Sequence, residues 1–97
     1  MQTTDGLNVV TDFKSKNKIT IHPNDGLDIG LMNSSYLMNF STILTEEKEV
    51  FQGEISLSND CKHQTIIINP NLWQKIGKLK SIKLSISDDK KTIFIVK

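Results

Sequence analysis

The sequence contains no arginine and no alanine, and Cys61 is its single cysteine. Without arginine, no side chain can hold a phosphate or carboxylate through the paired hydrogen bonds of a guanidinium. One cysteine excludes an intramolecular disulfide, which fits a reducing compartment, and we therefore expect a cytoplasmic or nuclear protein. No apolar run approaches the ~18 residues of a membrane span, and the segment from Met1 to Asp12 lacks the features of a secretion signal. We expect no membrane partner.

Neither sign of charge is in excess. The chain has 12 lysines against 11 acidic residues, so its net charge is +1. This balance excludes a strongly basic nucleic-acid coat protein and an acidic tail. Any basic surface must come from where the lysines are placed. At 97 residues, the chain is expected to form a single domain over residues 1–97.

The first half of the chain combines a helical spacing with several period-two patterns. Apolar residues between Leu7 and Phe13 recur at helical intervals and predict a short helix over residues 5–16, capped by Asp5. The segment Pro23 to Gly26 predicts a hairpin turn, and Thr45 to Glu49 predicts an acidic turn. Alternation of apolar and polar residues predicts strands at 18–22, 27–31, 36–44 and 51–58.

The second half begins with a short apolar run at residues 65–68, which predicts a buried strand. Asn69 and Pro70 are typical of a helix start, and the apolar arc that follows extends this helix to Leu79. Residues 82–86 and 92–96 predict a second hairpin. The fold class expected is therefore α+β, a mostly antiparallel sheet with two short helices packed on one face. Residues 5–32 and 69–96 share the predicted order helix, strand, turn, strand.

Few residues are arranged for catalysis. Cys61 and His63, beside Asp60, could form a nucleophile and base or half of a zinc site, but the second ligand pair of a zinc site is missing. A solvated loop is the favoured interpretation. The acidic residues Glu46, Glu47 and Glu49 and the segment 24–28 are interpreted as turns, and no glycine-rich phosphate loop is present. The sequence predicts no catalytic residue, no metal and no cofactor, and hence no enzyme.

Trp73 and the lysines near it leave two interpretations open. Trp73 could be a stacking platform for a base, or part of the apolar arc that packs into the core. Lys75, Lys78 and Lys80 could form a stripe that faces phosphates, or an ordinary solvated helix face.

Two stretches of sequence resemble a DNA sliding clamp, the family of proliferating cell nuclear antigen and its archaeal and viral relatives. Gly26 to Ser35, which ends in Met32-Asn33-Ser34-Ser35 before the strand 36–44, is similar to a glycine-led clamp strand and its Met-Asp-x-Ser turn, with Asn33 in place of Asp. Residues 66–79, with the hairpin at 82–95, resemble the second helix of a clamp domain and the strands around it. The resemblance spans roughly residues 5–97.

This resemblance implies a non-enzymatic, clamp-like domain that acts in DNA replication by self-association around duplex DNA. It implies that Lys75, Lys78 and Lys80, with Lys14 and Lys16 on the first helix, face the DNA backbone without reading sequence. The implied partners are duplex DNA, further copies of the chain, and a polymerase or other protein. The alternative is a small viral or phage interaction module that binds a partner through a sheet edge, either 36–44 or 92–97.

Overall fold

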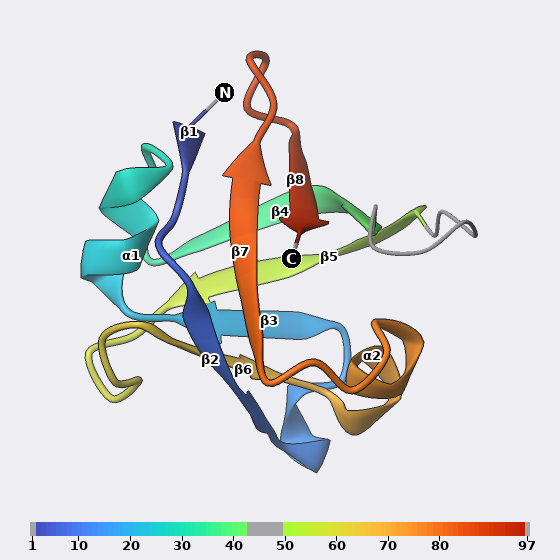
Figure 1. The fold of residues 1–97 in the computed structure, drawn as a ribbon. Helices are drawn as coiled ribbons and strands as arrows, with labels where there is room; N and C mark the ends of the chain where they lie inside the picture. The colour runs from blue at the N-terminus through green and yellow to red at the C-terminus, as the bar shows by residue number, and fades with distance from the viewer. Residues whose placement is uncertain (1, 43–49, 97) are drawn as a thin grey trace.

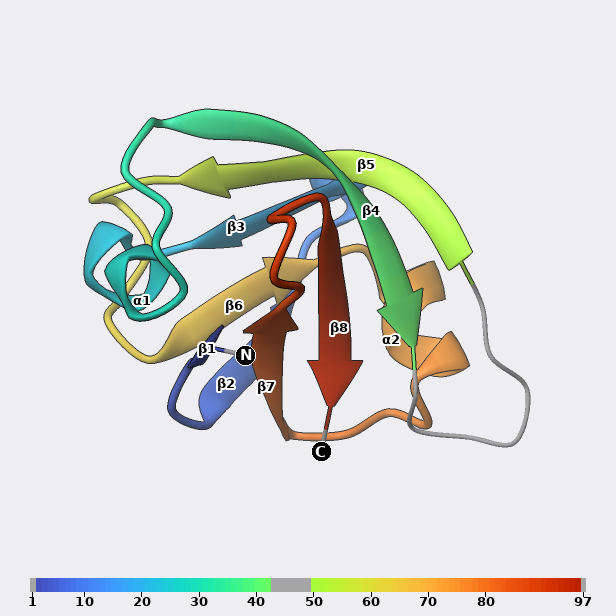
Figure 2. The same ribbon diagram turned by 90° about the horizontal axis from the view of Figure 1, so that it is seen from above.

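Eight strands and three short helical segments make up the fold, in a computed structural model that describes residues 2–42 and 50–96. Seven of the strands close into a β-barrel, which Figures 1 and 2 show from the side and from above. The elements are β1 (Gln2–Thr3), β2 (Leu7–Thr11), the 3-10 helix η1 (Phe13–Ser15), β3 (Lys18–Ile21), α1 (Pro23–Asp28), β4 (Ser35–Thr42), β5 (Val50–Leu57), β6 (Thr65–Ile68), α2 (Pro70–Lys75), β7 (Ser81–Ile86) and β8 (Thr92–Val96).

The barrel follows the order β4-β5-β3-β6-β2-β7-β8 and closes where β8 pairs with β4 in parallel. Its pairing is mixed, because β2–β6, β3–β5 and β4–β8 are parallel while the neighbouring pairs are antiparallel. The short β1 pairs with the end of β7, in line with β2. The interior is filled by apolar side chains with no exposed surface, among them Leu7, Ile21, Phe40, Ile66, Leu84 and Ile95.

The expected α+β sheet with two helices packed on one face is therefore wrong, and so is the clamp-like architecture. A closed barrel buries its own apolar face, so it needs no layer of helices to cover that face. The helices α1 and α2 have six residues each, and they lie at opposite sides of the barrel (Figures 1 and 2).

The predicted helix at 5–16 is replaced by β2 and η1. Along β2, buried Leu7 and half-buried Val9 alternate with exposed Asn8 and Val10, which is the period of a strand. The strand is held on both sides, by β6 and by β7. Asp12 rather than Asp5 supplies a cap, because its carboxylate accepts the Lys14 N–H of η1 at 2.9 Å.

The predicted hairpin at 18–31 is half right. The strand β3 is confirmed, but its turn and second strand are replaced by α1. His22 caps α1, since its Nδ1 accepts the Asn24 N–H at 3.0 Å, and Pro23 occupies the first helical position. The alternation that predicted a strand reflects Ile29 and Leu31, which are buried after the helix has ended.

Most of the other predicted elements are confirmed. Strands β4 to β8 lie where the sequence pattern predicted them. Residues 43–49, with the predicted acidic turn, are outside the described ranges. The helix α2 starts at Pro70 as predicted but ends at Lys75, short of Leu79. It ends because Gly77 and Lys78 both adopt positive φ, at 80° and 55°. None of the helices described is long and apolar enough to cross a membrane.

The chain does contain an internal repeat, but not the predicted one. Residues that lie 47 positions apart, such as Pro23 and Pro70, are equivalent around α1 and α2. Both helices start after a capping side chain that accepts the N–H two residues on, and both are followed by a glycine with positive φ, Gly30 or Gly77. The bonds Leu31 N–H to Gly26 O and Lys78 N–H to Trp73 O match at 2.8 Å each.

The same spacing of 47 residues relates two neighbouring strands of the sheet, β3 and β6. Thr20 pairs with Ile67, its own equivalent, so β3 and β6 are related by an approximate twofold axis between them. The barrel therefore has two equivalent corners, one beside α1 and one beside α2. Any difference between these corners comes from their side chains.

Candidate functional site

The α1 corner comprises His22, Asp25, Cys61, His63 and Gln64. Asp25 is fully buried, and its Oδ2 accepts the Gln64 N–H at 2.8 Å. Its Oδ1 lies 3.3 Å from His63 Nε2 and has no other polar partner among the described residues. The two imidazole rings, of His22 and His63, lie 5.6 Å apart at 55°. Asp25 therefore ties α1 to the turn that precedes β6, 39 residues further along the chain.

Cys61 and His63 do not form the nucleophile and base that their spacing allowed. Cys61 is buried, and its Sγ lies 3.5 Å from Thr65 O and 3.6 Å from Lys62 O, where a thiol donates to a carbonyl. His63 faces Asp25, whereas Asp60 is held in the loop by Ser58. Within residues 2–42 and 50–96, no three His, Cys, Asp or Glu side chains converge to hold a metal ion.

The thiol of Cys61 is kept in its protonated form. Burial raises its pKa above the ordinary value of 9.0, and the negative charge of Asp25 raises it further. We therefore expect Ellman's reagent at pH 8 to label folded Cys61 on the order of 100 times more slowly than the urea-unfolded chain. Equal rates in the two states would contradict the buried placement.

The raised pKa of Cys61 also predicts how the free energy of unfolding depends on pH. Because the folded pKa lies above 9.0, the contribution of Cys61 to stability is complete below pH 9.0 and is lost as pH rises toward the folded pKa. Denaturant titrations of the wild type and of Cys61→Ala, from pH 8 upward, isolate this contribution from other groups that titrate there. Their difference in free energy of unfolding should shrink with rising pH.

The α2 corner has the opposite charge and is hollow. At the position equivalent to Asp25 it carries Leu72, and at the position of Asp28 it carries Lys75. Lys16 and Lys18 replace His63 and Thr65 in the facing turn. A pocket of about 470 Å³ opens here, lined by Lys16, Asn17, Lys18, Ile19, Phe51, Gln52, Asn69, Asn71, Leu72 and Lys75.

The pocket has an apolar base and a polar rim. Ile19, Leu72 and the ring of Phe51 supply apolar surface, and Phe51 stacks on the buried Phe40 at 5.3 Å and 17°. Asn69 Oδ1 accepts the Asn71 N–H at 2.7 Å, which fixes the Asn69 amide at the rim. Exposed Lys16 and Lys18 stand on one side and Lys75 on the other. Such a lining suits a ligand with a flat apolar part and a negative group.

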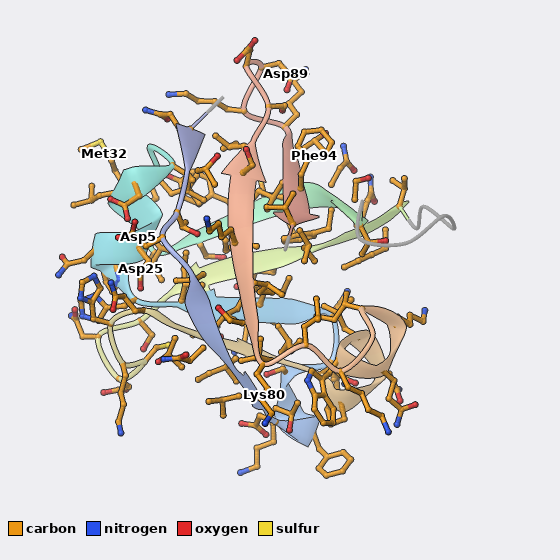
Figure 3. The ribbon with its side chains drawn as sticks, viewed as in Figure 1. Asp5, Asp25, Met32, Lys80, Asp89 and Phe94 are labelled. Atoms are coloured by element: carbon orange, nitrogen blue, oxygen red, sulfur yellow. The ribbon has the colours of Figure 1, made fainter. Side chains whose placement is uncertain are left out.

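All five lysines predicted to face DNA lie at the same end of the barrel, although only Lys14 and Lys75 are on helical segments. Lys14 is on η1, and Lys16 and Lys75 line the pocket. Lys78 Nζ lies 5.9 Å from the Trp73 ring centroid. Lys80 lies beside β2, since its carbonyl accepts the Val9 N–H at 2.9 Å (Figure 3). We call this the lysine end, made of Lys14, Lys16, Lys18, Lys75, Lys78 and Lys80.

The sequence analysis did not include Lys18 among the lysines expected to face DNA. It placed Lys14 on a helix over residues 5–16, whereas Lys14 lies on the 3-10 helix η1. Lys14, Lys16 and Lys18 are two residues apart, a spacing that could have indicated a common surface at the start of β3. Trp73 belongs to the packed arc rather than to an open platform, because it packs against the core and its Nε1 donates to Leu79 O at 3.0 Å. These two contacts decide between its two interpretations.

The proposed sheet edges are not free. Strands 36–44 and 92–97 were both candidates, but the structure pairs β4 with β8 and gives each a second neighbour, β5 and β7 respectively. The backbone groups that a partner strand would bind are thus used within the barrel.

Comparisons with known proteins add no identification. No family model matches the sequence, and neither the curated proteins nor the solved structures include a significant match to this chain.

Proposed function

We propose that this protein is a non-enzymatic nucleic-acid-binding barrel that contacts the phosphate backbone through its lysine end. The observation that carries the proposal is the gathering of six of the chain's 12 lysines on η1, around the pocket and on the segment that links α2 to β7. Lysine ammonium groups are mobile point charges that attract phosphates without fixing a register. Binding of this kind does not depend on base sequence.

The separation of charge supports the proposal. The net charge is only +1, and Asp25 and Asp28 lie on α1, away from the lysine end (Figure 1). The β7–β8 turn, also away from the lysine end, carries Asp88 and Asp89 beside Lys90 and Lys91 and so has no net charge. Asp12 belongs to the lysine end, where its carboxylate caps η1. A chain with balanced charge can therefore present one positive surface to a polyanion.

The proposal retains DNA backbone contact and omits the clamp ring. In a clamp ring the helices line a central hole and face the DNA, whereas the two helices of this barrel lie on opposite sides (Figure 2). The burial of Cys61, which also raises its thiol pKa, argues against the enzyme alternative that used Cys61 and His63.

Salt dependence tests the proposal directly. Fluorescence anisotropy with labelled DNA of ~20 nucleotides should show binding that weakens steeply between about 50 and 200 mM salt. If four to six lysines contact phosphates, the slope of log K against log salt should be about −3 to −5. Absence of binding at the lowest salt, or a slope near zero, would contradict the proposal.

A further inference from the structure

The α2 corner differs from the α1 corner in having no buried carboxylate at its centre. In the α1 corner the fold supplies its own anion, the buried carboxylate of Asp25, which binds the facing turn. In the α2 corner Leu72 takes that position, and the facing turn carries Lys16 and Lys18. Among the described residues that line this pocket, none carries a carboxylate. The negative charge that balances these lysines can come from a ligand.

The base of the pocket indicates what such a ligand carries beside its negative group. One face of the Phe51 ring stacks on Phe40, and the side chain also lines the pocket next to Leu72. Around them stand the amides of Asn71 and Gln52, both exposed, which can donate and accept hydrogen bonds. A volume of about 470 Å³ is ample for one nucleotide.

We infer that the α2 corner takes one unpaired base with its phosphate, so that the protein binds single-stranded nucleic acid in preference to duplex. The inference rests on the proposed function and adds its substrate class. Amides that both donate and accept suit the edges of several bases, and stacking on an aromatic ring is tolerant of sequence. A base within a duplex is covered on both faces and paired at its edge, so it cannot enter the pocket unless it is flipped out.

The test compares three labelled probes of equal length: single-stranded DNA, duplex DNA, and an abasic strand with the same phosphates. We expect the single strand to bind about 10-fold or more tightly than either of the others. A single strand with 2-aminopurine in place of one adenine should also change its fluorescence when the base enters the pocket.

Leu72→Asp places a carboxylate where the α1 corner has Asp25, and it should abolish the preference for the single strand. The matched control is Leu37→Asp, which makes the same charge change at a fully solvated site on β4, 89% exposed. Circular dichroism checks that both variants fold. Phe51→Leu, which removes the ring and keeps an apolar side chain, gives a second readout should Leu72→Asp fail to fold.

The outcomes separate this inference from the proposed function. Equal affinity for all three probes would overturn the pocket inference and leave phosphate binding by the lysine end intact. A preference for the single strand that survives both Leu72→Asp and Phe51→Leu would also overturn it. Absence of binding to every probe at low salt would remove both proposals.

Discussion

Reversing the charge of Lys16 and Lys18 together should weaken DNA binding on the order of 100-fold at about 50 mM salt. Both lysines are exposed at the rim of the pocket, Lys16 in the turn before β3 and Lys18 at the first residue of β3. Each Lys→Glu change removes one attraction to the phosphates and adds one repulsion. The slope of log K against log salt should also become shallower by about 2, one unit for each lysine that no longer neutralises a phosphate.

The matched control reverses Lys90 and Lys91 in the β7–β8 turn, away from η1 and α2 (Figure 1). Both double variants lower the net charge from +1 by the same four units. An effect of total charge alone would therefore weaken binding equally in the two proteins. A Lys90→Glu/Lys91→Glu protein that loses as much affinity as Lys16→Glu/Lys18→Glu would contradict a localised site. Titrations by anisotropy, each at several salt concentrations, give both the affinity and the slope.

The secondary structure could be predicted where the local pattern decides it. Alternation indicated β3, β4, β5, β7 and β8, and a short apolar run indicated β6. Asn69-Pro70 marks the start of α2 with a cap that the structure contains. The segment 27–31 shows the limit of such reasoning. Its alternation arises from a helix end followed by two buried side chains, Ile29 and Leu31, and a short apolar pattern cannot distinguish this from a strand.

The barrel itself could not be predicted, because its closure depends on distant pairings. Thr42 at the end of β4 lies beside Ile95 of β8, and Val9 of β2 lies beside Ile66 of β6. Both pairings are parallel, so no short turn announces them in the sequence. The repeat of 47 residues was open to sequence reasoning and was missed, because Ile21, Pro23, Asn24, Ile29 and Gly30 recur as Ile68, Pro70, Asn71, Ile76 and Gly77.

The candidate site, too, could be predicted from the sequence only in part. The sequence identified Lys16 and Lys75 as basic residues of possible function, but only the fold brings them to one pocket. Asp25 was interpreted as a turn residue, and its partner Gln64 could not be foreseen. Residue type thus indicates the chemistry available, whereas the contacts between distant segments decide which residues share a site.

Gly53→Ala should be among the most destabilising single changes in the protein, by about 3 kcal/mol, at the upper end of the range for overpacking. A Cβ at this position would lie 2.4 Å from Asn17 O and 3.3 Å from the Phe40 ring. The carbonyl cannot move aside easily, because it accepts the Glu54 N–H at 3.1 Å and belongs to the turn before β3. Thermal unfolding should occur roughly 15 °C lower than in the wild type.

Gly6→Ala is the matched control. Its added Cβ would lie 3.2 Å from Ser81 Oγ, a hydroxyl that can rotate away, so its effect should stay within about 0.5 kcal/mol. Gly53 is also the residue that lets the turn with Lys16 and Asn17 approach β5 beside Phe51, which is how the rim and the base of the pocket come together. A Gly53→Ala protein as stable as Gly6→Ala would mean that this turn does not rest on β5. The pocket, and the single-strand preference inferred from it, would then lose their structural support together.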